Sequence, residues 1–84
     1  MRTLVQSPLA LGRALRDARR RKRLTQHQLA DLAGVTQPTV SNVERGVSRV
    51  SLTTLLRILA ALKLELIVQS RESESLATAW QDDL

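Results

Sequence analysis

Apolar residues recur every three or four positions in four segments of the chain, which is the spacing of α-helices that bury one face. The first predicted helix covers about 8–22. Ser7 is its N-cap and Pro8 its first helical residue. The positions that it buries are Leu11, Ala14, Leu15 and Ala18. The arginines at 13, 16, 20 and 23 fall on another face, which we interpret as solvated.

Three shorter helices follow, and each has a hydroxyl residue directly before it. Thr25 caps a helix over about 26–33, and Gln28 completes a capping box. Gly34 then supplies a left-handed C-cap. Thr36 caps the third helix, which ends near Arg45 and tolerates a proline in its first turn. Ser51 caps the fourth, over about 52–62, whose apolar positions are Leu55, Leu56, Leu59 and Leu62.

The periodicity changes after the fourth helix. Apolar and polar residues alternate over 64–69 and branched side chains are frequent, so this segment predicts a β-strand. A lone strand has unpaired backbone groups, and the same strand of a second copy would supply its partner. We therefore predict a dimerisation strand over 63–70, although an extended tail packed on its own helices is the alternative. Its dimer contacts would be Leu64, Leu66, Ile67 and Val68.

Composition restricts the classes of protein that fit. Eighty-four residues make one small domain, since a domain usually has roughly 100–200 residues. The chain has no cysteine and one histidine, so we expect no disulfide, no metal site and no cofactor. No catalytic triad or phosphate-loop motif is present, and we expect neither an enzyme nor a small-molecule substrate. Without an apolar run of membrane-span length or a secretory signal, a cytoplasmic protein is expected.

Charge is distributed unevenly. Residues 1–71 carry 13 basic and four acidic side chains, a net +9, whereas residues 72–84 carry four acids and no base. The basic part favours a polyanion such as nucleic acid. The segment 71–84 is expected to be a flexible acidic tail, too polar to form a core, and it contains the only tryptophan, Trp80.

The run from Leu24 to Gly46, LTQHQLADLAGVTQPTVSNVERG, places two short helices around a tight turn. This is the spacing of a helix-turn-helix, whose second helix enters the major groove of DNA. Over about 11–62 the chain resembles the lambda-repressor-like XRE family. We therefore expect an all-α fold, with a four- to five-helix DNA-binding domain at 8–62, followed by the dimer strand and the tail.

DNA contacts follow from this placement. The exposed side chains near the start of the recognition helix are Gln37, Thr39, Ser41 and Asn42, and the resemblance implies base contacts by all of these except Ser41. Pro38 can offer only apolar contact, and Thr36 is first a cap and second a contact. The expected phosphate contacts are Thr25 and Gln26 at a helix N-terminus and Arg45, Ser48 and Arg49 in the following loop. His27 is expected to be solvated.

The XRE resemblance also implies a structural ion pair between Arg19 and Glu44, which joins the first helix to the third. Glu44 is therefore interpreted as structural and not as a catalytic acid, and no second carboxylate stands beside it.

The layout beyond the helices narrows the resemblance. Ser7-Pro8, the SLTTLLRIL helix, the LKLEL strand and a tryptophan near the end are similar to HipB-type antitoxins. This resemblance implies a homodimer that represses its own operon at a palindromic operator in double-stranded DNA. It also implies binding and neutralisation of a HipA-type serine/threonine kinase toxin, with Trp80 as the contact. Alternatively, Trp80 covers the protein's own core.

Two other functions remain open on the sequence. One is a stand-alone XRE repressor of a phage or plasmid with no toxin partner. The other is an inhibitor subunit whose DNA site is vestigial.

Overall fold

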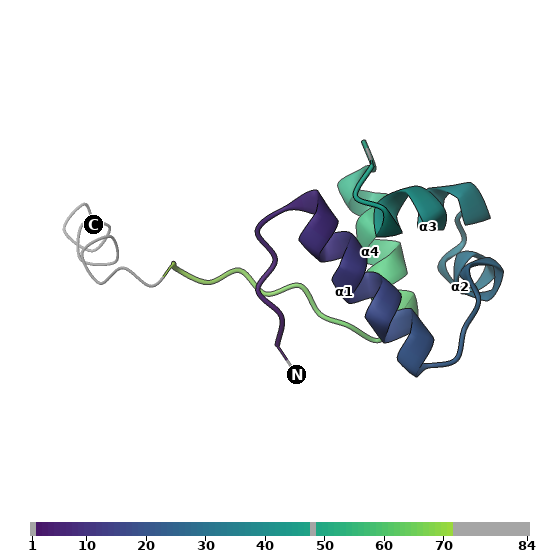
Figure 1. The fold of residues 1–84 in the computed structure, drawn as a ribbon, viewed down its shortest axis with the longest axis horizontal. Coiled ribbons are helices and arrows are strands. Elements are labelled where there is room, and N and C mark those ends of the chain that lie inside the picture. The colour runs from purple at the N-terminus through teal and green to yellow at the C-terminus, as the bar shows by residue number, and fades with distance from the viewer. Residues whose placement is uncertain (1, 48, 72–84) are drawn as a thin grey trace.

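The computed structural model describes residues 2–47 and 49–71, and within them the chain forms four α-helices (Figure 1). Their bounds are α1 Pro8–Arg21, α2 Gln26–Ala33, α3 Gln37–Glu44 and α4 Leu52–Ala61. All four predicted starts are confirmed, and the predicted ends of α1, α3 and α4 are one residue too long. Those last residues are the C-caps, whose backbone N–H groups still bond to the preceding turn.

Each helix begins at a neutral hydroxyl cap. The side-chain oxygens of Ser7, Thr25, Thr36 and Ser51 each accept a hydrogen bond from the backbone N–H three residues later. Such bonds satisfy donors that have no partner within the helix. No helix has an acidic residue in its first turn. The caps are local in sequence, which is why the helix starts could be predicted.

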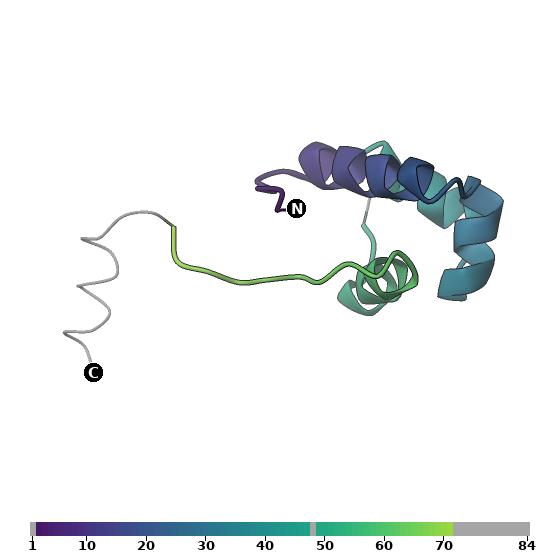
Figure 2. The same ribbon diagram turned by 90° about the horizontal axis from the view of Figure 1, so that it is seen from below.

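The turn between α2 and α3 depends on Gly34. Its φ of 70° lies in the left-handed region, and the following N–H of Val35 returns to the Ala30 carbonyl at 3.0 Å. Glycine adopts this conformation without the steric cost that other residues meet. The turn allows α3 to pack on both α1 and α2, while α2 packs on α4 (Figure 2).

The core is aliphatic and lies where the four helices meet. Its buried residues are Leu15, Ala18, Leu29, Ala30, Ala33, Val40, Val43, Ile58, Leu59 and Leu62. The predicted face of α4 is wrong at one position, because Leu56 is 44% exposed and Ile58 is buried instead. Both fit helical spacing with Leu55 and Leu59, so periodicity alone did not separate them.

Gly12 marks the place where α1 and α3 come closest. A Cβ atom at this position would overlap the Val43 carbonyl oxygen and lie 2.5 Å from that of Glu44. Only glycine, which has no side chain, permits this approach of two backbones. The crossing brings the end of α3 against the first half of α1.

The predicted strand over 64–69 is absent from the described part of the single chain. Residues 64–71 instead run as an extended segment away from α4 (Figures 1 and 2). Leu64 packs against the core, whereas Val68 is 92% exposed. A strand requires a hydrogen-bonded neighbour, and one copy of the chain supplies none here. Residues 72–84 of the expected acidic tail, including Trp80, lie outside the described residues, as does Ser48.

No helix within the described ranges has the length and apolar character needed to cross a membrane.

Candidate nucleic-acid interface

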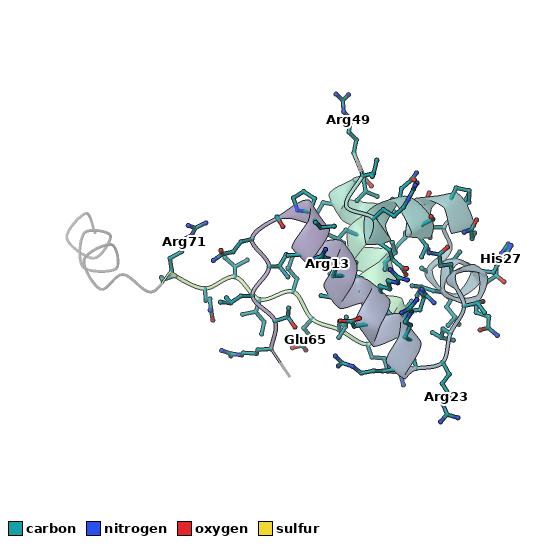
Figure 3. The ribbon with its side chains drawn as sticks, viewed as in Figure 1. Arg13, Arg23, His27, Arg49, Glu65 and Arg71 are labelled. Carbon is teal, nitrogen blue, oxygen red and sulfur yellow. The ribbon has the colours of Figure 1, made fainter. Side chains whose placement is uncertain are left out.

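The helices α2 and α3 place most of the predicted DNA contacts together. Gln37, Thr39, Ser41 and Asn42 are half-buried along α3, with Pro38 exposed among them. Gln26 stands in the first turn of α2, next to its cap Thr25. The exposed side chain of Arg49, in the loop after α3, points away from the body of the molecule (Figure 3).

Gln26 and Gln37 are joined directly across the turn. The Gln37 amide nitrogen donates to the Gln26 Oε1 at 2.7 Å. This bond uses one N–H of Gln37 and leaves its Oε1 and its second N–H available. A free oxygen and a free N–H are the two groups with which a glutamine forms a bidentate pair with adenine.

The same Gln26 side chain also forms a hydrogen bond to a buried ion pair. Its Nε2 donates to Glu44 Oε1 at 3.1 Å. Arg19 binds both oxygens of that carboxylate, with Nε at 2.6 Å and Nη2 at 2.9 Å, and its Nη1 donates to the Leu24 carbonyl at 2.8 Å. Arg19 and Glu44 are 8% and 6% exposed. A continuous chain of bonds therefore runs from Arg19 through Glu44 and Gln26 to Gln37.

The ion pair sets the pKa values of both partners. Burial raises the pKa of Glu44, but hydrogen bonds from Arg19 and Gln26 and the charges of Arg19 and Arg16 outweigh it, so the net pKa is lowered. The hydrogen bond to Glu44 raises the pKa of Arg19. Each group therefore stabilises the charged form of the other.

Thr36 and Thr39 are engaged with each other. The Thr36 Oγ1 accepts from the Thr39 backbone N–H at 3.3 Å, and the two hydroxyls lie 2.8 Å apart in a hydrogen bond. The capping role of Thr36 is therefore formed, and the Thr39 hydroxyl already has a partner.

Arg45 contacts a neighbour that the sequence reasoning did not assign to it. Its Nη2 donates to the Asn42 Oδ1 at 2.7 Å. The two residues are three positions apart at the end of α3, a spacing that brings helical side chains together. Arg45 was predicted as a phosphate contact and Asn42 as a separate base contact, and nothing in the sequence indicated that the two side chains touch.

Two shallow hollows border this surface. One, of about 290 Å³, is lined by Thr39, Asn42, Val47, Arg49 and Val50. The second, of about 350 Å³, shares three of these residues and extends to the start of α4, where Arg57 lines it. Arg57 was not predicted as a site residue. It lies one turn after Thr54, so both side chains are on the side of α4 that lines this hollow.

Several other basic residues lie elsewhere on the surface. Arg13, Arg16 and Arg20 are exposed on α1, as predicted. Arg23 does not continue this face, because α1 ends before it and its φ is 57°, and its side chain projects from that end of the helix (Figure 3). His27 is exposed and points outward (Figure 3).

Together, the tight turn, the packing of α3 across α2 and the polar outer side of α3 define a helix-turn-helix protein. The family model described as helix-turn-helix, HTH_3, matches residues 15–68. Antitoxin HipB from Escherichia coli O6:H1 is 35% identical over 80 residues, which are 95% of this chain and 85% of that protein.

Solved structures of related proteins have the same fold as this chain. The structure of a HipA-HipB-O2-O3 complex matches with a TM-score of 0.77 and 31% identity, over 84% of this chain and all of the matched chain. The restriction-modification controller protein C.AhdI from Aeromonas hydrophila matches with a TM-score of 0.66 and 40% identity, over 69% and 88%. The chain belongs to the HTH_3 helix-turn-helix family, as a member of its HipB antitoxin branch.

Proposed function

We propose that this protein is a DNA-binding antitoxin of a type II toxin-antitoxin system. As a dimer it represses its own operon, and it binds and neutralises a HipA-type kinase toxin without chemistry of its own. The observation that carries the DNA-binding part is the bond chain that ends at Gln37. It holds a base-reading amide on the outer side of α3, with the groups required for a bidentate contact still free.

In this function residues 8–62 are the DNA-binding domain. Two copies present two α3 helices to half-sites about one DNA turn, roughly 34–36 Å, apart. The proposed base contacts are Gln37, Thr39 and Asn42, and Pro38 beside them offers apolar contact only. The proposed phosphate contacts are Thr25 and Gln26 at a helix start and Arg45, Ser48 and Arg49 after α3. Ser41 and Thr36 are further proposed DNA contacts, with Thr36 acting first as a cap.

Two substitutions separate these roles. Replacing Arg49 with alanine should weaken binding to all sequences alike and reduce the salt slope of log K by about 0.9, one phosphate contact. Replacing Gln37 with alanine should instead cost about 1–3 kcal/mol on the operator and much less on unrelated DNA. Both are measured by fluorescence anisotropy across a salt series with the promoter DNA of the protein's own operon.

The matched control for Arg49 is Arg20→Ala. Arg20 is an exposed cation on α1, outside the proposed DNA contacts and the dimer segment, so its removal should leave the salt slope unchanged. Equal losses on operator and unrelated DNA for Gln37→Ala would contradict the proposed docking of α3.

The dimer is proposed to form through residues 63–70. Three consecutive apolar residues, Leu66, Ile67 and Val68, are exposed in the single chain. Lys63 and Leu64 still donate backbone hydrogen bonds to the last turn of α4, whereas residues 65–70 are extended and have no backbone partner within the described ranges. Pairing with the same segment of a second copy would satisfy these backbone groups and cover the apolar side chains.

Replacing Leu66 with proline should split the dimer, because proline has no N–H and cannot donate to a strand ladder. Sedimentation equilibrium is expected to show a monomer for Leu66→Pro and a dimer for Leu66→Val, which keeps the backbone donor. An unchanged dimer in the proline variant would rule out pairing at this segment.

The proposed toxin contact is Trp80 on the acidic segment 71–84. Those residues carry negative charge, which phosphate repels, so they suit a protein partner better than DNA. A tryptophan among polar residues is typical of an interface anchor. The support from relatives is that HipB is found in a solved complex with HipA.

Where a HipA-type kinase is encoded beside this gene, Trp80→Ala should weaken binding to it by about 2 kcal/mol or more, as for a hot spot. Isothermal titration calorimetry measures this, and Gln81→Ala is the neighbouring control. Operator affinity should not change in either variant. Unchanged kinase affinity for Trp80→Ala would remove the tail from the mechanism, and loss of the fold would show that Trp80 belongs to the core.

A second function is favoured by the match to the C.AhdI controller protein, which covers the helical domain. In that case the chain is a transcriptional regulator with no toxin partner. A kinase gene directly adjacent to this one would support the antitoxin, and its absence would support the stand-alone regulator.

A further inference from the structure

The two amide side chains on the outer side of α3 differ in what they can offer a base. Gln37 donates its bond to Gln26, so its oxygen stays free. Asn42 accepts its bond from Arg45, so one of the two lone pairs of its oxygen is used and a cation lies beside it. A guanidinium group can only donate hydrogen bonds. The atom of Asn42 that faces Arg45 must therefore be the oxygen, and the two N–H donors face away from Arg45.

The charges around Asn42 also favour a ligand that accepts hydrogen bonds. Arg45 places a positive charge 2.7 Å from the amide oxygen, and Arg49 lines the same hollow as Asn42. The acid on α3, Glu44, is buried and bound to Arg19. The described surroundings of Asn42 thus combine N–H donors with positive charge.

This arrangement disfavours adenine. A bidentate asparagine–adenine pair needs the amide oxygen to accept from the adenine N6 amino group while the amide nitrogen donates to N7. Arg45 uses one of the two lone pairs of that oxygen, so the adenine amino group would have to bind the other lone pair beside a positive charge. Guanine instead offers two acceptors, O6 and N7, in the major groove.

We infer that Arg45 is a positioning residue for base recognition: it holds Asn42 with its N–H groups outward, so that this end of α3 selects guanine in place of adenine. The inference rests on the proposed DNA-binding function. It assigns the two amides of α3 to different bases, with Gln37 suited to adenine and Asn42 to guanine.

The test is selection of bound duplexes from a pool with randomised half-sites, followed by sequencing, for the wild type and four variants. Asn42→Ala identifies the base position that Asn42 contacts, because preference is lost there. At that position the wild type is expected to prefer guanine. Arg45→Ala should shift the guanine-to-adenine ratio toward adenine by about tenfold, since the amide oxygen becomes free.

Two further variants separate positioning from charge. Arg49→Ala removes a neighbouring positive charge but leaves the bond to Asn42, so it should lower affinity and keep the guanine preference. Arg45→Lys keeps a donor and should retain part of the preference. Circular dichroism checks that Arg45→Ala, at an exposed position, keeps the helical content.

Three outcomes overturn the inference while the proposed function stands. They are a wild-type preference for adenine at the Asn42 position, an unchanged base ratio in Arg45→Ala, or no position that depends on Asn42. If the wild type enriches no sequence at all, the proposed function fails and the inference falls with it.

Discussion

Replacing Arg19 with alanine is expected to lower the free energy of unfolding by about 3–5 kcal/mol, because it leaves the buried Glu44 carboxylate without its cation. The free energy of unfolding of a small domain is only about 5–15 kcal/mol, so this loss would be a large part of it and would raise the unfolded fraction. The change also removes the anchor of Gln26 and, through it, of Gln37. Urea unfolding followed by circular dichroism measures the loss.

Two variants keep this prediction testable if the alanine variant does not fold. Arg19→Lys retains the charge but loses the two-pronged contact, so an intermediate loss is expected. Arg20→Ala removes an exposed arginine from the next position and should change stability by no more than about 0.5 kcal/mol. A loss below about 1 kcal/mol for Arg19→Ala would contradict the importance of the pair.

The same pair predicts a pH dependence with a definite sign. The pKa of Glu44 in the folded protein lies below its ordinary value of 4.5, so its contribution is complete above that pH and is lost as the pH falls through the folded-state pKa. The stability difference between the wild type and Glu44→Gln should therefore stay constant from about pH 7 to 5 and decrease below about 4.5. Arg19 titrates far above this range and does not contribute to it.

Replacing Gly12 with alanine is expected to destabilise the protein by about 2 kcal/mol or more, although alanine favours a helix by about 1 kcal/mol over glycine. The added methyl group would lie 2.5 Å from the Glu44 carbonyl oxygen and closer still to that of Val43. These are backbone atoms, so α1 and α3 must move apart to make room. Urea unfolding measures the effect, with operator affinity as a second readout because α3 is displaced.

Gly34→Ala is the matched control for Gly12. A Cβ atom there meets nothing within 4 Å, and the cost arises only from its left-handed φ of 70°. That cost is about 1–2 kcal/mol, without displacement of a helix. Operator affinity at constant folded fraction should therefore fall for Gly12→Ala and not for Gly34→Ala. A Gly12→Ala variant more stable than the wild type would show that the helices are not in contact there.

The helix starts and the helix-turn-helix were predictable because they depend on residues a few positions apart. Thr25 and Gln28, or Gly34 and its neighbours, act within one turn of chain. The face of α4 was less certain, because Leu56 and Ile58 both fit its periodicity and only the packing of other helices decides between them.

Contacts between side chains were harder to anticipate. The bond from Gln37 to Gln26 joins two helices, and that from Arg45 to Asn42 depends on rotamers, which residue spacing does not determine. Gly12 gave no periodic signal, because its role depends on the backbone of a helix more than 20 positions away. The predicted strand would need a neighbouring chain to pair with, and in the single chain residues 64–71 are extended without one.

The hydroxyl caps have a consequence for how this surface can evolve. Aspartate caps a helix about as well as threonine, so folding alone would accept it at the starts of α2 and α3. In the proposed docking on DNA, an aspartate there would set a full negative charge beside the phosphates. Thr25 and Thr36 would then be sites where the fold accepts a carboxylate but binding to a polyanion does not, so selection for DNA binding would act on residues that cap helices.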